Sequence, residues 1–328
     1  MKIIGIGNAL VDVLVRLKDD SVLKELNLER GGMTLIDDAK HTAISGLLDA
    51  LSPSVSTGGS AGNTMLALAN MGANPGFIGK IGDDKMGRFF AETCKSAGIN
   101  APLVVGEEAS GVANTFISQD GERTFATHLG AAANLKAEEV TGEWFEGYDL
   151  LYLEGYLVQN HELIETVART AKECGLKVCL DLASYNVVRD NLEFMHRLVR
   201  DYVDIVFANE EESAAFTGNN NPEAALEEMA SLTDIAIVKV GSKGSYAMSG
   251  GQKYFAGTNK VDVADTTAAG DFFAGGFLYA YSQDAHPEAC LRCGTLLAGN
   301  VIQVVGTRLS EETWNEIRIS AKQIITSK

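Results

Sequence analysis

The stretch VDIVFANEEESAAF, residues 203–216, decides the fold. Its first part, 203–208, is an apolar run of strand length, and it passes directly into 210–216, which reads as a helix. Similar apolar runs and helix-like segments alternate on both sides of it. The runs are 148–153, 177–182 and 235–240, and the helix-like segments are 161–174 and 222–232. This alternation predicts βαβ units, a mostly parallel sheet and helices on both faces.

The N-terminal third continues the pattern, with strand-like residues at 3–6 and 76–81 and helical spacing at 61–71. Two segments break it, because they are rich in short alternating stretches and turn signals. Asp120-Gly121 in the second of them is a hairpin signature. We therefore predict an α/β domain and a small β-rich lid. The domain comprises residues 1–13, 36–111 and 128–328, and the lid comprises 14–35 and 112–127.

The composition excludes several classes of protein. The chain has 328 residues, and its 27 Lys+Arg against 44 Asp+Glu give a net charge of −17. A phosphate-backbone binder needs a basic face, so we expect no nucleic-acid partner. No apolar run reaches the roughly 18 residues of a membrane span, and the N-terminus lacks the features of a secretory signal. We expect a cytoplasmic protein that does not bind membranes.

The five cysteines are scattered and odd in number, which argues against a disulfide framework. Cys290 and Cys293 form a C-x-x-C, but they lie in an apolar stretch with helical spacing. No second Cys or His pair completes a zinc site. We interpret these two side chains as packed thiols.

The strongest signal for chemistry is DTTAAGD, residues 265–271. It overlaps VDVAD, 261–265, which we expect to end a strand, and it precedes an apolar segment with helical spacing. Small residues at a strand-to-helix junction let backbone amides face a ligand, and the helix N-terminus adds partial positive charge. Asp271 lies in the first helical turn. It either caps the helix or accepts a proton from an attacking hydroxyl.

A second cluster, TGGSAGNT at 57–64, opens the helix-like segment at 61–71. Its paired glycines, Gly58 and Gly59, permit close approach of a ligand, and Asn63 can hydrogen-bond a polyol. The alternative is a glycine-rich turn in which Ser60 is the N-cap of the helix.

Polar residues also follow three predicted strands, where ligands gather in parallel sheets. Asn8 and Asp12 lie after the first strand, close to the lid. Asn209 and Glu212 follow 203–208 and suit hydrated Mg²⁺, although a solvated acidic helix start is the alternative. Residues 239–245, KVGSKGS, form either a loop that meets a nucleotide or a hairpin turn.

Several common sites are missing from the sequence. No G-x-x-x-x-G-K-[ST] motif is present, and Gly5-x-Gly7 lacks the third glycine of a dinucleotide fingerprint because position 10 is leucine. The five histidines show no metal-ligand spacing, and no G-x-S-x-G follows a strand. We therefore expect neither a Walker-type nucleotide site, a dehydrogenase, a zinc enzyme nor a serine hydrolase.

Taken in order, these segments resemble the pfkB (ribokinase-like) family of carbohydrate and nucleoside kinases. GGSAGNTMLALANMGANPGFIGKIGDDKMG, 58–87, is similar to the first signature of that family, and DTTAAGDFFAGGF, 265–277, to the second. Three further stretches look most like the adenosine-kinase branch: residues 7–37, ATHLGAAANL at 126–135 and LRCGTLLAGNVIQVVG at 291–306.

The resemblance implies a three-layer α/β/α domain with a β-lid, and transfer of a phosphoryl group from ATP to a primary hydroxymethyl group. It implies Mg²⁺ as a cofactor and leaves a requirement for K⁺ open. It makes Asp271 the general base and gives anion-hole amides to Ala268, Ala269 and Gly270. It assigns acceptor binding to Asn8, Asp12, Gly58, Gly59 and Asn63. It assigns the ATP site to Lys239, Gly241, Ser242, Gly244 and Asn300. It assigns Mg²⁺, through water, to Asn209 and Glu212, and a monovalent cation to Asp265 and Thr267.

The chain departs from the commonest form of the second signature at Ala268, where glycine is usual. Only the amide is needed there, so the added methyl group is fatal only if the residue requires a positive φ. We expect a working site.

Adenosine is the favoured acceptor. The alternatives are a ribose, fructose or keto-deoxy-sugar kinase, or a catalytically silent regulator that binds a sugar or nucleotide. A basic residue aimed at a carboxylate favours an acid sugar, whereas an apolar, aromatic-lined pocket over Asp12 favours a nucleoside. Leu10 and Phe125 are candidates for that lining, or ordinary core residues. The expected partner is a small-molecule substrate, and the chain is a monomer or a homodimer.

Overall fold

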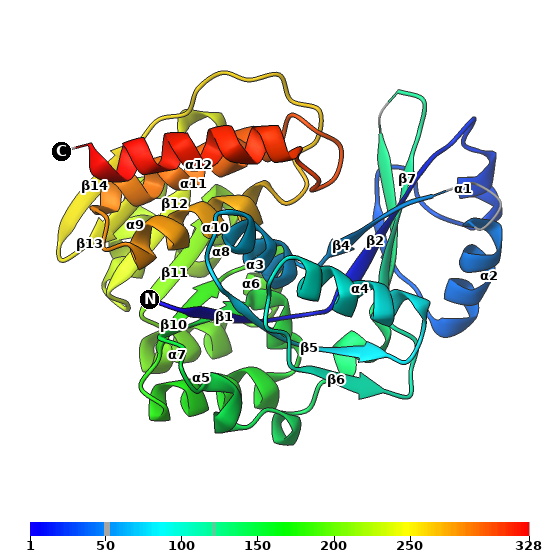
Figure 1. The fold of residues 1–328 in the computed structure, drawn as a ribbon, viewed down its shortest axis with the longest axis horizontal. Helices are drawn as coiled ribbons and strands as arrows, with labels where there is room; N and C mark the ends of the chain where they lie inside the picture. Colours follow the sequence, from blue (N-terminus) through cyan, green and yellow to red (C-terminus); the bar gives the residue numbers. More distant parts are fainter. Residues whose placement is uncertain (49–52, 121, 328) are drawn as a thin grey trace.

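The computed structural model describes residues 1–48, 53–120 and 122–327. Its larger sheet lies at the centre of the molecule (Figure 1). The strands found in the described residues are, in spatial order, β14 (Gln252–Ala256), β13 (Ser245–Ser249), β12 (Ile235–Lys239), β11 (Ile205–Asn209), β10 (Lys177–Asp181), β9 (Leu150–Glu154), β1 (Ile3–Ile6), β5 (Gly76–Gly82) and β6 (Leu103–Gly106). Neighbours pair in parallel from β12 to β6, while β13 and β14 pair antiparallel at one edge.

Helices cover both faces of this sheet. One face packs against α3 (Ser60–Asn70), α4 (Lys85–Ser96), α10 (Ala269–Ser282), α11 (Pro287–Val301) and α12 (Glu311–Thr326). The other packs against α5 (His161–Glu173), α6 (Tyr185–Asp190), α7 (Leu192–Tyr202), α8 (Glu210–Thr217) and α9 (Pro222–Ala230). Alternate residues of β11 enter the two cores: Phe207 joins the first and Val206 the second. Double coverage is why the strands are continuous apolar runs, and the predicted three-layer α/β/α fold is confirmed.

A smaller sheet extends from the larger one, on the right in Figure 1. In spatial order it contains β3 (Met33–Leu35), β8 (Arg123–His128), β7 (Gly111–Ile117), β2 (Leu10–Arg16) and β4 (Ser54–Gly58), and it carries α1 (Ser21–Glu25) and α2 (Asp38–Leu48). The predicted hairpin is present as β7 and β8, and Gly121 of its turn lies outside the described residues. The domain boundaries at 14–35 and 112–127 stay a prediction, and the sheet also takes in β4 and the start of β2.

The smaller sheet has one covered face and one open face. Val11, Val13 and Val15 of β2 belong to the same core cluster as Ile44 and Leu48 of α2. The residues between them, Leu10, Asp12 and Leu14, point to the opposite face because side chains alternate along a strand. That opposite face carries part of the candidate site.

Our prediction that residues 261–265 end a strand is wrong, because residues 257–264 are irregular. The backbone amides of Ala264 and Asp265 both donate to the carbonyl of Ile302, at 2.8 and 3.0 Å. The segment is therefore fixed to the end of α11 rather than to a sheet. The alternation in VDVAD has the period of a strand but no neighbouring strand to pair with.

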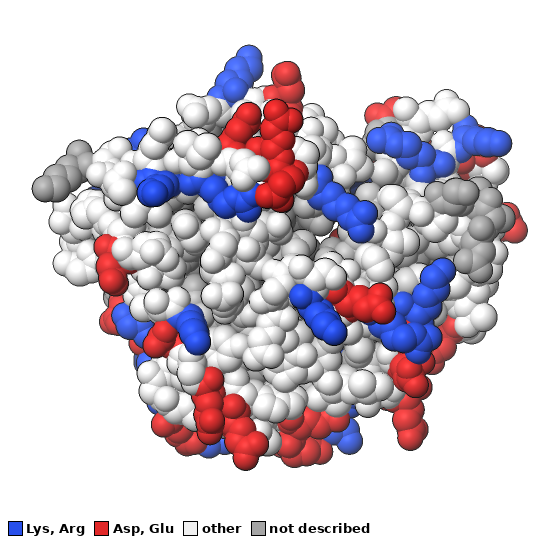
Figure 2. All heavy atoms as spheres, viewed as in Figure 1, with Lys and Arg blue, Asp and Glu red and all other residues white. Residues whose placement is uncertain are grey.

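The surface, the helices and the cysteines can be compared with what the composition predicted. Acidic side chains gather along the lower edge of the face in Figure 2, near α5. None of the helices in the described residues combines the length and apolar content that crossing a membrane demands. All five cysteines are free thiols, and Cys290 and Cys293 are buried, as predicted for packed thiols.

Candidate active site

Asp271 lies in the first turn of α10, where the two signature segments meet. Its carboxylate oxygens accept hydrogen bonds from Ser60 Oγ at 2.7 Å and Asn63 Nδ2 at 2.9 Å, both on α3. Gly275 of α10 allows the two helices to approach closely, because a Cβ at this position would lie only 2.7 Å from the Cβ of Ala67 on α3. Gly59 is the N-cap of α3, so the alternative that Ser60 caps this helix is wrong. The Ser60 hydroxyl orients Asp271 instead.

Burial raises the pKa of Asp271 to about 6, although the hydrogen bonds from Asn63 and Ser60 act to lower it. The carboxyl group of Asp271 is therefore mainly ionised at neutral pH, and it can bind a proton and release it again. A general base works best with a pKa near the operating pH. The position and charge of Asp271 suit proton transfer.

Asp12 lies on β2, in a cradle formed by two glycines of β4 and the turn after it. A Cβ on Gly58 would lie 2.4 Å from Oδ1 of Asp12. Gly59 has a φ of +80°, and a Cβ there would lie 2.1 Å from the carbonyl oxygen of Asn8. Burial and the nearby charges of Asp271 and Asp265 raise the pKa of Asp12 to about 7. Asp12 and Asp271 therefore belong to one electrostatic cluster.

A buried carboxyl group that the sequence analysis missed holds this region to the central sheet. Glu154, at the end of β9, accepts hydrogen bonds from Asn8 Nδ2 at 2.8 Å and from the amide of Ala61 at 3.0 Å. Burial raises its pKa to about 7. Asn8 is thereby fixed beside the start of α3. Within the described residues, Oδ1 of Asn63 is buried without a hydrogen-bond partner.

Lys239 ends β12 beside the N-terminus of α10. Its Nζ lies 3.1 Å from Oδ2 of Asp181, and a Cβ on Gly270 would lie 3.3 Å from this Nζ. Burial acts to lower the pKa of Lys239, but the charges of Asp181 and Glu212 raise it overall. A buried cation thus faces the turn that contains the predicted anion-hole amides. Asp181 was not predicted as a site residue, although an acid at the end of an apolar strand-like run was a usable signal.

Asn209 and Glu212 form a reciprocal cap at the start of α8. The amide of Asn209 donates to Glu212 Oε2 at 2.8 Å, and the amide of Glu212 donates to Asn209 Oδ1 at 2.8 Å. Glu212 is only 4% exposed, so the alternative of a solvated helix start is wrong for this residue. Burial raises its pKa to about 7. A divalent cation nearby would favour its ionised form.

The described residues contain no group of three His, Cys, Asp or Glu side chains that could hold a metal directly. Asn209 and Glu212 fit the alternative that the resemblance implies, which is contact with Mg²⁺ through water. When bound, Mg²⁺ would offset negative charge on the ATP phosphates. This role stays a prediction.

Three of the predicted nucleotide residues, Gly241, Ser242 and Gly244, follow β12, at the end of the sheet where Asn209 lies. Gly241, Ser242 and Lys243 form a single 3-10 turn that connects β12 to β13. A Cβ on Gly244 would lie 2.1 Å from the carbonyl oxygen of Ala256, which explains the glycine. Asn300, in the last turn of α11, donates to the carbonyl of Leu296 at 2.8 Å. Within the described residues no hydrogen bond joins the side chain of Asn300 to the other predicted nucleotide residues, and its role stays a prediction.

Ala268 has a φ of 60° and lies directly before α10. This left-handed conformation costs a non-glycine residue roughly 1 kcal/mol or more. The turn tolerates the methyl group, since Ala268 packs at the edge of the core. The anion-hole turn therefore stores strain that a glycine would remove.

Arg123 of β8 reaches the same turn and was not predicted. Its guanidinium donates to Oδ1 of Asp265 and, at 2.7 Å, to the hydroxyl of Thr267. Asp265 also accepts from the amides of Thr267 and Gly306, each at 2.8 Å. Burial opposes ionisation of Asp265, but these bonds, above all that from Arg123, hold its pKa below the usual range.

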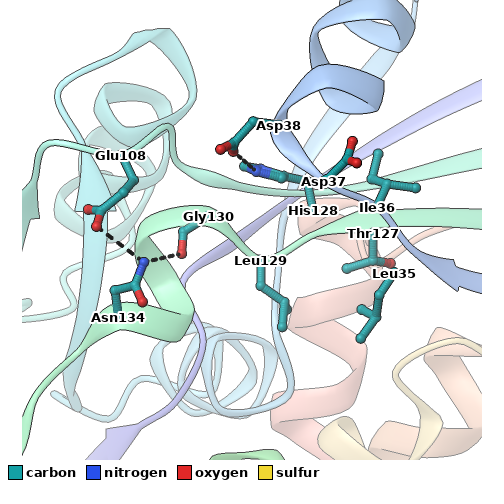
Figure 3. A pocket seen from close by; sticks show the side chains of 10 residues that line it. All are labelled: Leu35, Ile36, Asp37, Asp38, Glu108, Thr127, His128, Leu129, Gly130 and Asn134. Carbon is teal, nitrogen blue, oxygen red and sulfur yellow. Dashed lines mark hydrogen bonds and ion pairs between the residues drawn. The ribbon is translucent and has the colours of Figure 1, made fainter.

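A cavity of about 290 Å³ opens beside the smaller sheet (Figure 3). It is lined by Leu35, Ile36, Asp37, Asp38, Glu108, Thr127, His128, Leu129, Gly130 and Asn134. Asp12 and Asp271 are not among these residues. The register of the smaller sheet links the cavity to Asp12, because Asp12 pairs with Ala113, Ala113 with Thr127, and Thr127 with Leu35. The cavity lies at the far end of this row.

The profile of the pfkB family carbohydrate kinases matches residues 34–314, and the chain belongs to this family. It is 30% identical to a 5-dehydro-2-deoxygluconokinase of Lacticaseibacillus casei over 261 residues, 75% of this chain and 80% of that protein. It is 32% identical to an ATP-dependent ribose-1-phosphate kinase of Halopiger xanaduensis over 252 residues, 74% of this chain and 81% of that protein.

Solved structures extend the similarity over nearly the whole chain. An adenosine kinase of Sinorhizobium meliloti superposes with a TM-score of 0.85 and 31% identity, and the match covers 97% of this chain and 99% of that one. A probable sugar kinase of Rhizobium etli gives 0.85 and 31%, with 98% of each chain covered. The predicted enzyme class, a kinase of this family, is confirmed. Kinases of this family use ATP, generally with Mg²⁺, and act on small molecules.

Proposed function

We propose that this enzyme phosphorylates the primary hydroxymethyl group of a nucleoside, with adenosine as the favoured acceptor. The observation that carries the proposal is an open apolar face on the smaller sheet, in register with Asp12. Ribose hydroxyls would bind at Asp12, and the base would lie on that face. The face supplies apolar stacking surface, which a nucleobase requires and a free sugar does not.

The register fixes the dimensions of this face. Strands lie about 4.8 Å apart, so Thr127 is about 10 Å and Leu35 about 14 Å from Asp12 across the sheet. A nucleoside held at Asp12 by its ribose therefore extends its base toward Thr127 and the cavity in Figure 3. A free pentose or hexose would leave most of this row uncovered.

The neighbouring row provides stacking surface. Leu14 pairs with Thr115, Thr115 with Phe125, and Phe125 with Met33. Met33 is 63% exposed and Leu35 56%, and Phe125 belongs to neither hydrophobic core. Large apolar side chains left open beside a polar site indicate a surface that binds an apolar group. The alternative that Phe125 is a core residue is therefore not supported.

Charge on this face disfavours an acid sugar. Its two arginines, Arg16 and Arg123, lie two rows from Asp12, and Arg123 is bonded to Asp265. The cavity at the end of the row is lined by three carboxylates, those of Asp37, Asp38 and Glu108. A substrate carboxylate placed there would be repelled, whereas the exocyclic amine of adenine could donate hydrogen bonds.

The proposed mechanism uses the charges described above. Asp271 accepts the proton of the acceptor's hydroxymethyl group. At the same time the hydroxymethyl oxygen bonds to the terminal phosphorus of ATP, and the bond between that phosphorus and the ADP oxygen breaks. The amides of residues 268–270 and the ammonium group of Lys239 stabilise charge on the transferred group. Asp12 and Asn63 hold the sugar hydroxyls. Closure of the smaller sheet over the site excludes water as a competing acceptor.

A panel of acceptors tests the proposal. ADP formation from ATP is measured with adenosine, inosine, ribose, fructose and 5-dehydro-2-deoxygluconate. We expect kcat/KM for adenosine to exceed that for each sugar by at least about 100-fold, because the base adds binding surface that the sugars lack. A higher kcat/KM with any sugar would overturn the proposal. Binding of acceptors without turnover would instead indicate a regulator.

A further inference from the structure

We propose that Arg123 takes the place of a monovalent cation beside the anion-hole turn, so that phosphoryl transfer by this enzyme does not require K⁺. The resemblance assigned a monovalent cation to Asp265 and Thr267. The side chains in the structure do not fit that ion. They form instead a site for a guanidinium group carried by the smaller sheet.

The hydrogen bonds leave little room for an ion at these residues. Oδ1 of Asp265 accepts from Arg123 and from the amide of Thr267, and Oδ2 accepts from the amide of Gly306. The hydroxyl of Thr267 accepts from Arg123. A monovalent cation would need these same oxygens as ligands. Each of them is already bonded to an N–H donor.

Burial explains why this place needs a positive charge. The Asp265 side chain is 1% exposed and that of Arg123 is 16% exposed. An unpaired carboxylate at such a depth is strongly unfavourable. A monovalent ion would supply one positive charge, and the guanidinium supplies the same charge with directed hydrogen bonds.

The origin of the charge has a further consequence. Arg123 is the first residue of β8, 142 positions before Asp265 in the chain, and it pairs across the strands with Ile117. A bound ion would belong to the turn alone, but Arg123 arrives with the smaller sheet. The charge beside residues 268–270 is therefore complete only when this sheet lies over the site. Arg123 is a positioning residue that couples the position of the smaller sheet to the charge beside the anion-hole turn.

The first experiment compares salts. For the unmodified enzyme we expect kcat to change less than twofold when KCl is replaced by NaCl or choline chloride. Arg123→Ala should lose at least tenfold in kcat in choline chloride and regain at least threefold in KCl or NH₄Cl. Arg30→Ala is the matched control, because Arg30 forms exposed ion pairs with Asp20 and Asp120. This control should behave as the unmodified enzyme does in every salt.

The second experiment does not depend on an acceptor. Melting temperatures are measured in KCl and in choline chloride at equal ionic strength. K⁺ should raise the melting temperature of Arg123→Ala by several degrees and leave the unmodified protein and Arg30→Ala unchanged. Arg123→Lys, which keeps the charge, should stay insensitive to K⁺ and serves if the alanine variant does not fold.

Two results would overturn the proposal: activation of the unmodified enzyme by K⁺ of several-fold, or an Arg123→Ala protein whose rate and melting temperature both ignore K⁺. Because the melting experiment needs no acceptor, failure of the nucleoside proposal would leave this test intact. Conversely, a K⁺-dependent enzyme could still prefer adenosine.

Discussion

The two sheets of this molecule differ in how much of their surface the rest of the chain covers. The larger sheet is packed with helices on both faces, and the side chains of Asp181 and Lys239 at its strand ends are only 10% and 16% exposed. The smaller sheet is covered on one face only and leaves Met33 and Leu35 exposed on the other. Full coverage holds charges in fixed positions, which suits chemistry. A face that the chain leaves uncovered is free to bind and release a ligand, which suits substrate recognition.

The largest effect should come from removing the charge of Asp271. We expect Asp271→Asn to lower kcat by about 10²–10⁴-fold, the range typical of a lost general base, while the affinity for ATP stays nearly constant. Steady-state kinetics and ATP binding by calorimetry measure the two quantities. A variant with near-normal kcat would show that the buried site of the larger sheet does not carry the chemistry.

A smaller effect is expected on the open face. Phe125→Ala should raise KM for adenosine by about 2- to 12-fold and leave KM for ATP unchanged, since the loss of an aromatic contact costs about 0.5–1.5 kcal/mol. Phe255→Ala is the control, because Phe255 is 46% exposed on an edge strand of the larger sheet. If both variants changed KM for adenosine equally, the open face would have no special part in recognition.

The smallest effect concerns pH, where stability and activity should move in opposite directions. Burial raises the pKa values of Asp12, Glu154 and Glu212 to about 7 and that of Asp271 to about 6, against ordinary values of 3.8 for Asp and 4.5 for Glu. Between about pH 6 and 8 these four groups therefore bind more protons in the folded protein than in the unfolded chain, so lowering the pH from 8 to 6 stabilises the fold. The pKa of His41 is lowered from its ordinary value of 6.5, so protonation of this residue destabilises the fold as the pH falls. It is one group, and its effect opposes that of the four carboxyl groups.

We expect the melting temperature to rise by a few degrees from pH 8 to 6 while kcat/KM falls, because proton transfer and sugar binding need Asp271 and Asp12 ionised. Scanning calorimetry and initial rates over the same buffers measure both. A melting temperature that drops over this interval would contradict the electrostatic description of the site.

The sequence predicted the larger sheet well because a strand covered on both faces is a continuous apolar run, which a single sequence displays directly. It also placed Asp271 and Asn63 on separate helix starts. It did not predict that Ser60 would orient Asp271, or that Arg123 would reach Asp265, because these partners are 211 and 142 positions apart. No local pattern in one sequence encodes such pairs.

Local conformation set a second limit. The positive φ of Ala268 follows from the turn before α10, and alanine itself gives no sign of it. The irregular segment 257–264 shows the reverse problem, since its alternation resembles a strand but its hydrogen bonds go to Ile302. In both places tertiary packing decides a backbone that residue preferences would assign otherwise.

Glu154 restricts how this chain can vary. A Cβ on Gly7 would lie 2.3 Å from Oε2 of Glu154 and 2.8 Å from the Cβ of Ala61. Any larger residue at position 7 would displace the carboxyl group that holds Asn8 and the start of α3. Mutational libraries should therefore tolerate replacements of Gly7 only alongside a shorter side chain at position 154 and a glycine at position 61, so these three positions should change together among functional variants.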